Sequence, residues 1–351
     1  MKIVVLAGGV STERAVSLVT GAGVCRALRE NGHRAVFVDL FLGLEDVPGD
    51  LESVFDAPDG LCPEAGIGAD APDLEAVRLA RKDQSGCVFG PNVLELCRLA
   101  DIVFLGLHGL DGEDGRIQAA FDLLGIRYTG GGHLASGMAM NKLVTKRIMD
   151  AAGLPTPKWQ SLEYGPEDIP RLAAELPMPC VIKTASGGSS LGVFLPEDRA
   201  ALAEALEQVR GYDGGILWEE RIYGRELTVG VLGDRALPPV EILPAEGEFD
   251  YAAKYQAGGA REICPAPVTE AQKQEMGALA LKLHRTLGLE VYSRTDFIMD
   301  EAGKFWCLEI NNLPGMTPGS LIPKEAAAVG MSYNELCEEI VRQSYGLKRK
   351  G

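Results

Sequence analysis

The chain has little positive charge for its length. Its 351 residues include 34 lysines and arginines against 50 aspartates and glutamates, which gives a formal net charge of −16 at pH 7. A nucleic-acid-binding protein normally presents a basic face to the phosphate backbone. The one basic cluster, Lys348 to Lys350, lies near the C-terminal end of the sequence, where we expect a solvated tail. The sequence therefore disfavours nucleic acid as a partner.

Long hydrophobic runs are also absent. The apolar stretch from Lys2 to Ala7 is too short for a signal peptide. No window approaches the roughly 20 apolar residues that span a bilayer. We therefore expect a cytoplasmic protein with no membrane partner. The length of 351 residues suggests two or three compact units.

The cysteines form no recognisable spacing. The eight of them, at positions 25, 62, 87, 97, 180, 264, 307 and 337, include no C-x-x-C pair. This argues against a zinc site or a disulfide framework and fits a reducing compartment. Internal repeats and low-complexity tracts are absent as well.

What is present first is an alternation of strands and helices. Apolar runs and helical periodicity predict, in order, a strand from Lys2 to Ala7, a helix to about Asn31, a strand from Arg34 to Phe41, a helix from Val93 to Leu99 and a strand from Ile102 to Leu107. Residues 43–90, rich in Gly, Pro and Asp, interrupt the pattern as an irregular insertion. Residues 1–130 are therefore predicted to form an α/β domain with a parallel sheet.

Two further domains are predicted, at 131–217 and 218–351. The first should contain a helix near Ala135 to Ala152, a strand ending at Lys183, a helix from Glu197 to Val209 and a strand from Gly215 to Ile222. The second should contain short antiparallel strands, a helix from Glu270 to Leu287, a hairpin over 291–311 and a terminal helix.

The hairpin carries the sharpest local pattern. Side chains alternate along a strand, so Arg294 and Asp296 share one face, as do Glu309 and Asn311. If Met299 pairs near Phe305, Asp296 falls opposite Glu309, with Cβ atoms about 5 Å apart. Two carboxylates that close repel each other unless a cation or a proton lies between them.

Two interpretations of this face remain open. It could be the solvated polar side of a hairpin, with Arg294 as counter-ion to the carboxylates. The neutral oxygen of Asn311 beside two carboxylates instead favours Mg²⁺, which takes hard oxygen ligands and fills its remaining positions with phosphates and water.

Glycine-rich loops follow two of the predicted strands. The loop from Ser186 to Gly192 could let backbone N–H groups approach a phosphate, with Lys183 and Lys142 near it, although no Gly-Lys-Ser/Thr motif makes it a P-loop. Gly8 and Gly9 follow the first strand, but the spacing G-x-G-x-x-G of dinucleotide-binding proteins is missing.

Taken in chain order, the motifs resemble those of the ATP-grasp superfamily and, within it, the D-alanine–D-alanine ligase family. The resemblance covers almost the whole chain except residues 43–90. The segments that carry it are Gly8-Gly9-Val10-Ser11-Thr12-Glu13-Arg14, His108-Gly109 with Gly112-Glu113-Asp114-Gly115, Tyr128-Thr129-Gly130, Lys142, Lys183, Gly188-Ser189-Ser190-Leu191-Gly192, Asp250-Tyr251 with Lys254-Tyr255, Cys264-Pro265-Ala266, Arg294 with Asp296, Glu309 with Asn311, and Leu313-Pro314-Gly315-Met316-Thr317 with Ser320-Leu321.

The resemblance implies an α/β fold: a Rossmann-like N-terminal domain followed by a two-part ATP-grasp fold with ATP between its parts. It implies an enzyme that phosphorylates the carboxylate of one D-alanine with ATP. The amine of a second D-alanine then attacks the D-alanyl phosphate, which yields D-alanyl-D-alanine for peptidoglycan precursors. It also suggests a homodimer, and a lid at about 246–263 that excludes water.

Residue roles follow from the same resemblance. Two Mg²⁺ ions, which Mn²⁺ could replace, would be held by Asp296, Glu309 and Asn311. ATP would be bound by Lys142, Lys183, Glu219, Glu220, Ile222, Glu226 and Lys254. The catalytic set would be Glu13, Ser189, Tyr255 and Arg294, with Arg294 stabilising the oxyanion, and substrate would contact His108, Gly315, Ser320 and Leu321.

The pocket for the second amino acid matches the D-alanine type at Tyr255 and Leu321, whereas D-serine-type ligases tend to carry Arg at the latter position. Departures from the family pattern occur at Ala15, Ser186-Gly187, Glu220 and Ala252. A ligase for D-serine or another amino acid is therefore one alternative. The others are a dinucleotide-dependent oxidoreductase and a non-catalytic nucleotide-binding or scaffold protein.

Overall fold

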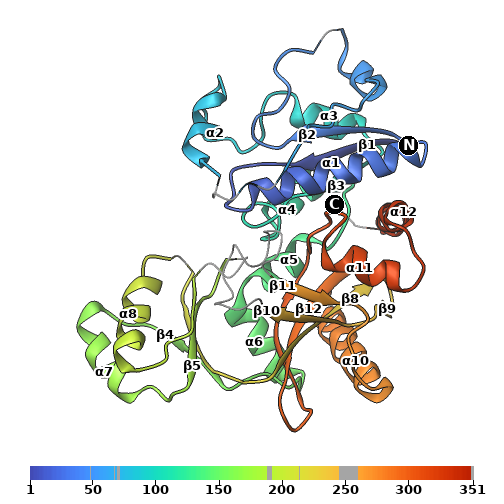
Figure 1. Ribbon diagram of the computed structural model, residues 1–351. Helices are drawn as coiled ribbons and strands as arrows, with labels where there is room; N and C mark the ends of the chain where they lie inside the picture. The colour runs from blue at the N-terminus through green and yellow to red at the C-terminus, as the bar shows by residue number, and fades with distance from the viewer. Residues whose placement is uncertain are drawn as a thin grey trace.

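The computed structural model describes residues 1–47, 49–66, 68, 72–187, 192–212, 214–244 and 260–348. Three β-sheets, each with its own helices, meet at a central junction (Figure 1). In this view the sheet of the N-terminal residues lies at the top, that of the middle residues at the lower left, and that of the C-terminal residues at the lower right.

The N-terminal unit is a parallel sheet of order β2-β1-β3, as predicted. Its elements are β1 (Lys2–Ala7), α1 (Arg14–Glu30), β2 (Arg34–Asp39), η1 (Leu51–Asp56), α2 (Leu74–Ala80), α3 (Val93–Leu99), β3 (Ile102–Leu105) and α4 (Arg116–Leu124). The central strand is apolar on both faces because helices cover both. Crossovers are right-handed, so α1 and α3, which lead to opposite sides of β1, lie on opposite faces of the sheet (Figure 1).

One predicted helix is broken in two. The segment from Ala135 to Ala152 forms α5 (His133–Met140) and α6 (Lys142–Ala151). Asn141 lies between them with extended backbone, and its side-chain oxygen accepts the Val144 N–H at 3.1 Å. An asparagine that caps a new helix satisfies its first N–H groups, and this capping outweighs the continuous apolar pattern. Lys142 opens α6, as predicted.

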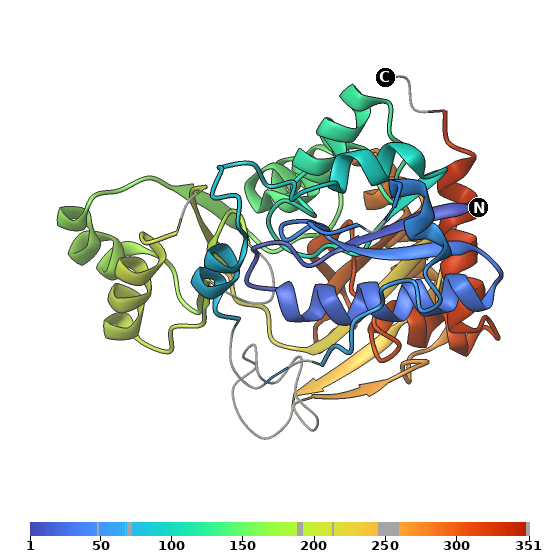
Figure 2. The same ribbon diagram turned by 90° about the horizontal axis from the view of Figure 1, so that it is seen from above.

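The middle residues form an antiparallel sheet of order β4-β7-β5-β6. Its elements are β4 (Trp159–Leu162), η2 (Pro166–Asp168), α7 (Ile169–Glu175), β5 (Cys180–Thr184), β6 (Val193–Phe194), α8 (Arg199–Val209) and β7 (Ile216–Glu220). The helices α7 and α8 cover one face over a core of their own that includes Leu202 and Trp218. Seen from above, this unit projects away from the other two (Figure 2).

The C-terminal sheet has the order β11-β10-β8-β12-β13, with β9 paired to β8. Its elements are β8 (Arg225–Leu232), β9 (Arg235–Ala236), β10 (Val240–Pro244), β11 (Ala260–Ile263), α10 (Glu270–Thr286), β12 (Tyr292–Met299), β13 (Phe305–Asn311) and α11 (Leu321–Ala328). Within the predicted lid at about 246–263, residues 260–263 pair with β10 as a strand. Residues 245–259 lie outside the described part of the chain.

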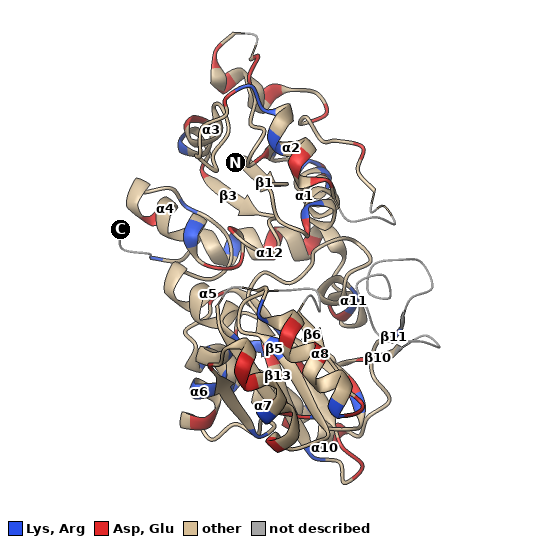
Figure 3. Ribbon diagram, turned by 90° about the vertical axis from the view of Figure 1, so that its left-hand side faces the viewer, with Lys and Arg blue, Asp and Glu red and all other residues tan. Residues whose placement is uncertain are grey.

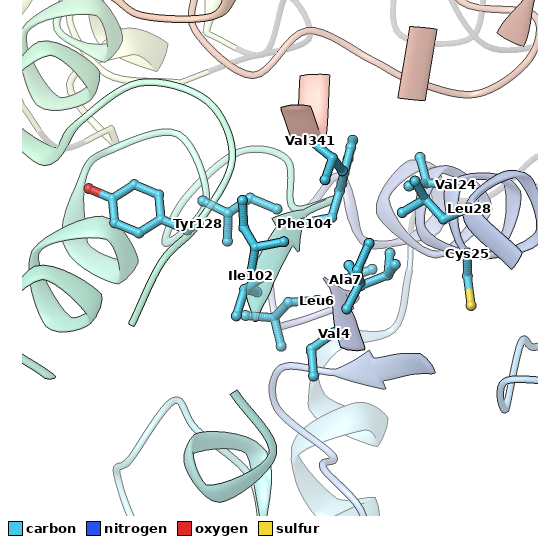
Figure 4. Close-up of a cluster of buried hydrophobic side chains, with 14 of the residues drawn as sticks. Val4, Leu6, Ala7, Val24, Cys25, Leu28, Ile102, Phe104, Tyr128 and Val341 are labelled. Carbon is cyan, nitrogen blue, oxygen red and sulfur yellow. The ribbon is translucent and has the colours of Figure 1, made fainter. Parts of the chain in front are cut away.

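The last helix returns to the first domain. α12 (Tyr333–Tyr345) packs on α1 and β3, and Val341 lies against Phe104 in the core of the N-terminal sheet (Figure 4). This core also includes Tyr292 and Leu313. The N- and C-terminal units therefore share one apolar interior. No helix in the described residues is long and apolar enough to cross a membrane.

Candidate active site

A cavity of about 320 Å³ opens where the three units meet. Loops after β1 and β3, the α5–α6 junction, β8, the β12–β13 hairpin and the segment from Gly315 to Leu321 line it. Open α/β sheets place ligands beyond the carboxyl ends of their parallel strands, which accounts for the position of the first two loops.

Eleven predicted site residues line this cavity. They are Glu13, His108, Lys142, Glu226, Arg294, Asp296, Glu309, Asn311, Gly315, Ser320 and Leu321. Residues more than 300 positions apart in the sequence, such as Glu13 and Leu321, thus line the same cavity. Their gathering is a result of the fold that no local pattern could show.

The predicted hairpin register is confirmed. Asp296 pairs with Glu309, Arg294 with Asn311 and Met299 with Phe305, with an irregularity after Asp296. Burial alternates along β12, which turns Arg294 and Asp296 to the same face. Arg294 donates from Nε to Asp296 Oδ1 at 2.9 Å and from Nη2 to Oδ2 at 3.1 Å.

Neighbouring groups fix the rest of this face. The Thr228 hydroxyl on β8 donates to Asp296 Oδ1 at 2.6 Å. Lys142 Nζ lies 3.4 Å from Glu309 Oε2 and donates to the Gly187 carbonyl at 2.7 Å. Asn311 Oδ1 is buried and accepts no hydrogen bond from the described residues. A buried oxygen without a donor beside two carboxylates fits a metal ligand better than a structural amide.

The loops that follow β1 and β3 of the N-terminal sheet supply Glu13, His108 and Glu113. His108 Nε2 lies 2.9 Å from Thr20 Oγ1, and its Nδ1 lies 3.2 Å from the Leu313 carbonyl and 3.7 Å from Glu113 Oε1. Burial raises the pKa of Glu113 to about 7; the Glu13 carboxylate adds to the rise, and His108 and Arg294 oppose it. Glu113 belonged to a recognised motif but had no predicted role.

Another acidic residue, Glu219, is buried outside the lining of the cavity. Glu219 on β7 is 1% exposed and forms ion pairs with Lys183 on β5 and Lys146 on α6. These lysines lower the pKa of Glu219 despite its burial, and Glu219 with Glu309 raises that of Lys183. Acidic and basic positions lie on neighbouring elements around β5 and β13 (Figure 3).

The sequence analysis predicted no role for Lys146. It follows Lys142 by one helical turn, and its Nζ also donates to Thr156 Oγ1 at 2.5 Å and to the Cys307 carbonyl at 3.4 Å. It therefore joins α6 to both neighbouring sheets. A lysine on the same face as Lys142 was the available signal, but only the fold shows that it is buried.

The remaining predicted residues lie elsewhere. Glu220 ends β7 and Ile222 follows it; both are half-buried, and neither lines the cavity. Ser189, Lys254 and Tyr255 lie outside the described residues. The roles proposed for these residues stay predictions.

Asp39 ends β2, where a dinucleotide-binding domain carries the acidic residue that binds the ribose, but it is not placed to receive a ribose. Its carboxylate accepts from Arg14 Nη2 at 2.6 Å and from the N–H groups of Phe41 and Leu42 at 2.9 and 3.0 Å. The acidic group that a dinucleotide-binding domain would need is thus used to hold its own loop. This counts against the oxidoreductase alternative.

Comparisons with known proteins agree along the whole length. The family models described as "D-ala D-ala ligase N-terminus" and "D-ala D-ala ligase C-terminus" match residues 2–131 and 148–342. The D-alanine--D-alanine ligase of Pediococcus pentosaceus is 43% identical over 343 residues, which covers 97% of both chains. That of Lacticaseibacillus casei is 41% identical over 352 residues, which covers 100% of this chain and 98% of the relative.

Solved structures give the same result. A D-alanine--D-alanine ligase from Bacillus anthracis, complexed with ATP, has a TM-score of 0.73 at 27% identity and covers 98% of this chain and 97% of its own. The VanG D-Ala:D-Ser ligase from Enterococcus faecalis has a TM-score of 0.75 at 25% identity and covers 98% and 99%. The fold is accordingly a Rossmann-like α/β domain followed by a two-part ATP-grasp fold, and the chain belongs to the D-alanine–D-alanine ligase family.

Proposed function

We propose that this protein joins two D-alanine molecules with ATP. The carboxylate of the first D-alanine attacks the γ-phosphorus of ATP, and ADP leaves. The amine of the second D-alanine attacks the resulting D-alanyl phosphate, and phosphate leaves as the peptide bond forms. The observation that carries this proposal is that the hairpin residues Arg294, Asp296, Glu309 and Asn311 line the same cavity as Glu13 from the N-terminal loop.

The charges of the cavity support bound cations. Its described lining includes six carboxyl groups, on Glu13, Glu113, Glu226, Glu262, Asp296 and Glu309. Among the described residues that line the cavity, the lysines and arginines facing these carboxyl groups are Lys142 and Arg294. A polyphosphate would be repelled from such a wall unless divalent cations lay between. We place two Mg²⁺ ions, replaceable by Mn²⁺, on Asp296, Glu309 and Asn311, where they would neutralise phosphate charge.

The other cavity residues would bind and orient the two amino acids and the phosphates of ATP. Arg294, whose guanidinium is held by Asp296, would stabilise the oxyanion that develops when the amine attacks. Glu13 offers a carboxylate to the ammonium group of the first D-alanine, and Lys142 a cation to the phosphates. His108, fixed from both ring nitrogens, and Leu321 shape the side of the cavity that receives the second amino acid.

The finer organisation is proposed on the family resemblance. The domains are 1–130, 131–217 and 218–351, with ATP between the last two, where Lys183, Glu219, Glu220, Ile222, Glu226 and Lys254 contact it. Ser189 and Tyr255 complete the set beside Glu13. The protein acts in the cytoplasm as a homodimer, which sedimentation would test.

The first experiment follows ADP, phosphate and dipeptide with ATP, Mg²⁺ and D-alanine. All three products should appear together. Glu309→Gln should abolish most of the turnover and raise the Mg²⁺ requirement, and Arg294→Ala should reduce kcat by about 10²–10³-fold. Glu301→Gln, an exposed carboxylate in the turn of the same hairpin, is the matched control and should retain activity. Turnover equal in all four proteins would rule out this site.

A second candidate, which the comparisons do not favour, is the D-alanine–D-serine reaction; the VanG D-Ala:D-Ser ligase has a similar fold. D-Alanine and D-serine supplied together at equal concentration distinguish the two. Leu321 lines the cavity and offers a serine hydroxyl no hydrogen bond, so D-alanyl-D-alanine should predominate. An excess of D-alanyl-D-serine would instead select the second candidate.

A further inference from the structure

Two cysteines that are far apart in the sequence meet at one backbone carbonyl. Cys25 lies in the middle of α1, and Cys62 lies in the insertion after η1. Their sulfur atoms lie 3.7 and 3.9 Å from the Gly60 carbonyl oxygen, so both thiols donate to the same acceptor. The Cys25 sulfur points away from Val24 and Leu28 of the core (Figure 4).

Two arginines of α1 bind the backbone of the segment that carries Cys62. Arg29 donates to the carbonyls of Ala57 and Pro58 at 2.9 and 2.8 Å. On the other side of the thiols, Arg26 donates to the Pro63 carbonyl at 3.1 Å. The segment that carries Cys62 is thus tied to α1 on both sides of Cys62 in the sequence, which holds both sulfurs beside the Gly60 carbonyl.

The two thiols differ in access and in acidity. Cys25 is fully buried, whereas Cys62 is half-buried and can meet a small reagent. The neighbouring Cys25 thiol and the charges of Arg26 and Arg29 lower the pKa of the Cys62 thiol, although its partial burial opposes them. The neighbouring Cys62 thiol and burial raise the pKa of Cys25. Thiolates are the nucleophiles of disulfide exchange, so Cys62 reacts first.

We propose that Cys25 and Cys62 form a modification site, a dithiol that a low-molecular-weight disulfide oxidises to an intramolecular disulfide. The Cys62 thiolate attacks the small disulfide, one thiol leaves, and a mixed disulfide forms. The Cys25 sulfur then attacks Cys62, releasing the second small thiol. Both protein thiol protons end on the two released thiols, and the protein is oxidised by the two electrons that the small disulfide gains.

The other cysteines cannot follow this course. Cys97, Cys180, Cys307 and Cys337 are buried, and burial raises the pKa of each thiol. Cys264 is half-buried, but its thiol donates to the Lys324 carbonyl at 3.6 Å, and burial raises its pKa to about 11. Cys87 is exposed. It serves as an internal measure of reagent access, because with no neighbouring thiol it should stop at the mixed disulfide.

The test oxidises the full-length reduced protein with glutathione disulfide, blocks free thiols and maps peptides by mass spectrometry. The peptides of Cys25 and Cys62 should be joined, two hydrogens lighter, while Cys87 carries glutathione. Because the bond closes the long loop between residues 25 and 62, the oxidised protein should melt roughly 5 °C higher, and reductant should reverse the shift.

Two variants make the outcome decisive. Cys62→Ser, in a half-buried segment, should remove the link and the melting shift, and Cys87→Ser should retain both. Cys62 found only as a glutathione adduct with Cys25 still free would overturn the proposal. So would Cys25 and Cys62 both remaining reduced while Cys87 is fully modified. Neither result depends on the ligase reaction.

Discussion

Glu113 faces Glu13, His108 and Arg294 in a volume that water hardly reaches, since its own exposure is 6%. Its carboxyl group therefore stays protonated to higher pH in the folded protein than in the unfolded chain, where the ordinary pKa is about 4.5. The contribution of this group to stability is fully present below about pH 4.5 and is lost as pH rises through about 7.

Glu113→Gln should remove this pH dependence. The melting temperature of the wild type minus that of the variant is expected to fall between pH 4.5 and 7 and to stay level above that range. Calorimetry or thermal fluorescence across these pH values measures the difference. A difference that grows with pH would show that the carboxylate, and not the acid, is the form that the fold stabilises.

Lys146→Met tests the buried group behind the cavity. With Lys146 present, Glu219 is shared by two lysines, and Lys183 keeps positive charge to offer a phosphate. Without it Glu219 and Lys183 form a neutral pair, so the KM for ATP should rise about tenfold, equivalent to about 1.4 kcal/mol. The KM for D-alanine should change little.

The matched control for that change is Lys158→Met, an exposed lysine of the same unit. It should leave both KM values unchanged. If Lys146→Met raised both KM values equally, or lowered only the melting temperature, its role would be general packing and not the charge of the nucleotide site.

Single residues were predictable where a local rule governs them. The pairing of Asp296 with Glu309 followed from strand alternation and the short turn, and the structure confirms it. Glu113 and Lys146 could not be assigned in this way, because their roles arise from groups brought near by separate elements.

At the scale of elements, α1 packs unusually close to the sheet. A Cβ on Gly21 would lie 2.5 Å from Ala7 Cβ and 2.8 Å from the Phe37 ring. Contacts this short leave no room for even one methyl group. The glycine therefore sets the distance between helix and sheet at the end where Glu13 enters the cavity.

Gly21→Ala should destabilise the protein although alanine is the better helix former. The gain in helix propensity is about 1 kcal/mol, whereas overpacking typically costs 1–3 kcal/mol. Here the added methyl group would clash with Ala7 on the central strand β1. Urea unfolding should therefore show a lower midpoint. Gly86→Ala, where no atom lies within 4 Å, should leave the midpoint nearly unchanged.

Most elements could be predicted because apolar periodicity marks them. The helix at Val93–Leu99 has the predicted bounds, and the strand after it ends at Leu105 instead of Leu107. The break at Asn141 was missed because capping by one side chain competes with a pattern that runs through it. The order of strands within each sheet depends on tertiary packing, which periodicity does not encode.

At the scale of the whole molecule, the first and last segments form one core. Leu336, Cys337, Ile340 and Val341 of α12 belong to the same buried cluster as Val4, Leu6 and Phe104. The N-terminal domain is thus completed by residues that the sequence places in the third domain. Only the general division into a Rossmann-like domain and an ATP-grasp fold was predictable.

Ile340→Ala should accordingly destabilise the N-terminal sheet. Ile340 is fully buried, and removing its side chain leaves a cavity that costs about 2–5 kcal/mol. Hydrogen exchange should rise in β1 and β3. Val329→Ala, at a site 55% exposed, should change stability by less than about 0.5 kcal/mol. Equal exchange in β1 and β3 for both variants would contradict a shared core.

The shared core also sets an order of events during synthesis. β3 ends at Leu105, but the helix that packs on it begins at Tyr333. At about 5–20 residues per second, the ribosome needs roughly 10–50 s to make the residues between them. Through that interval the part of the apolar sheet face over β3, which α12 covers in the finished protein, is not yet covered by the chain. Chaperones that bind emerging chains would meet this face first, and folding of the domain would finish only as translation ends.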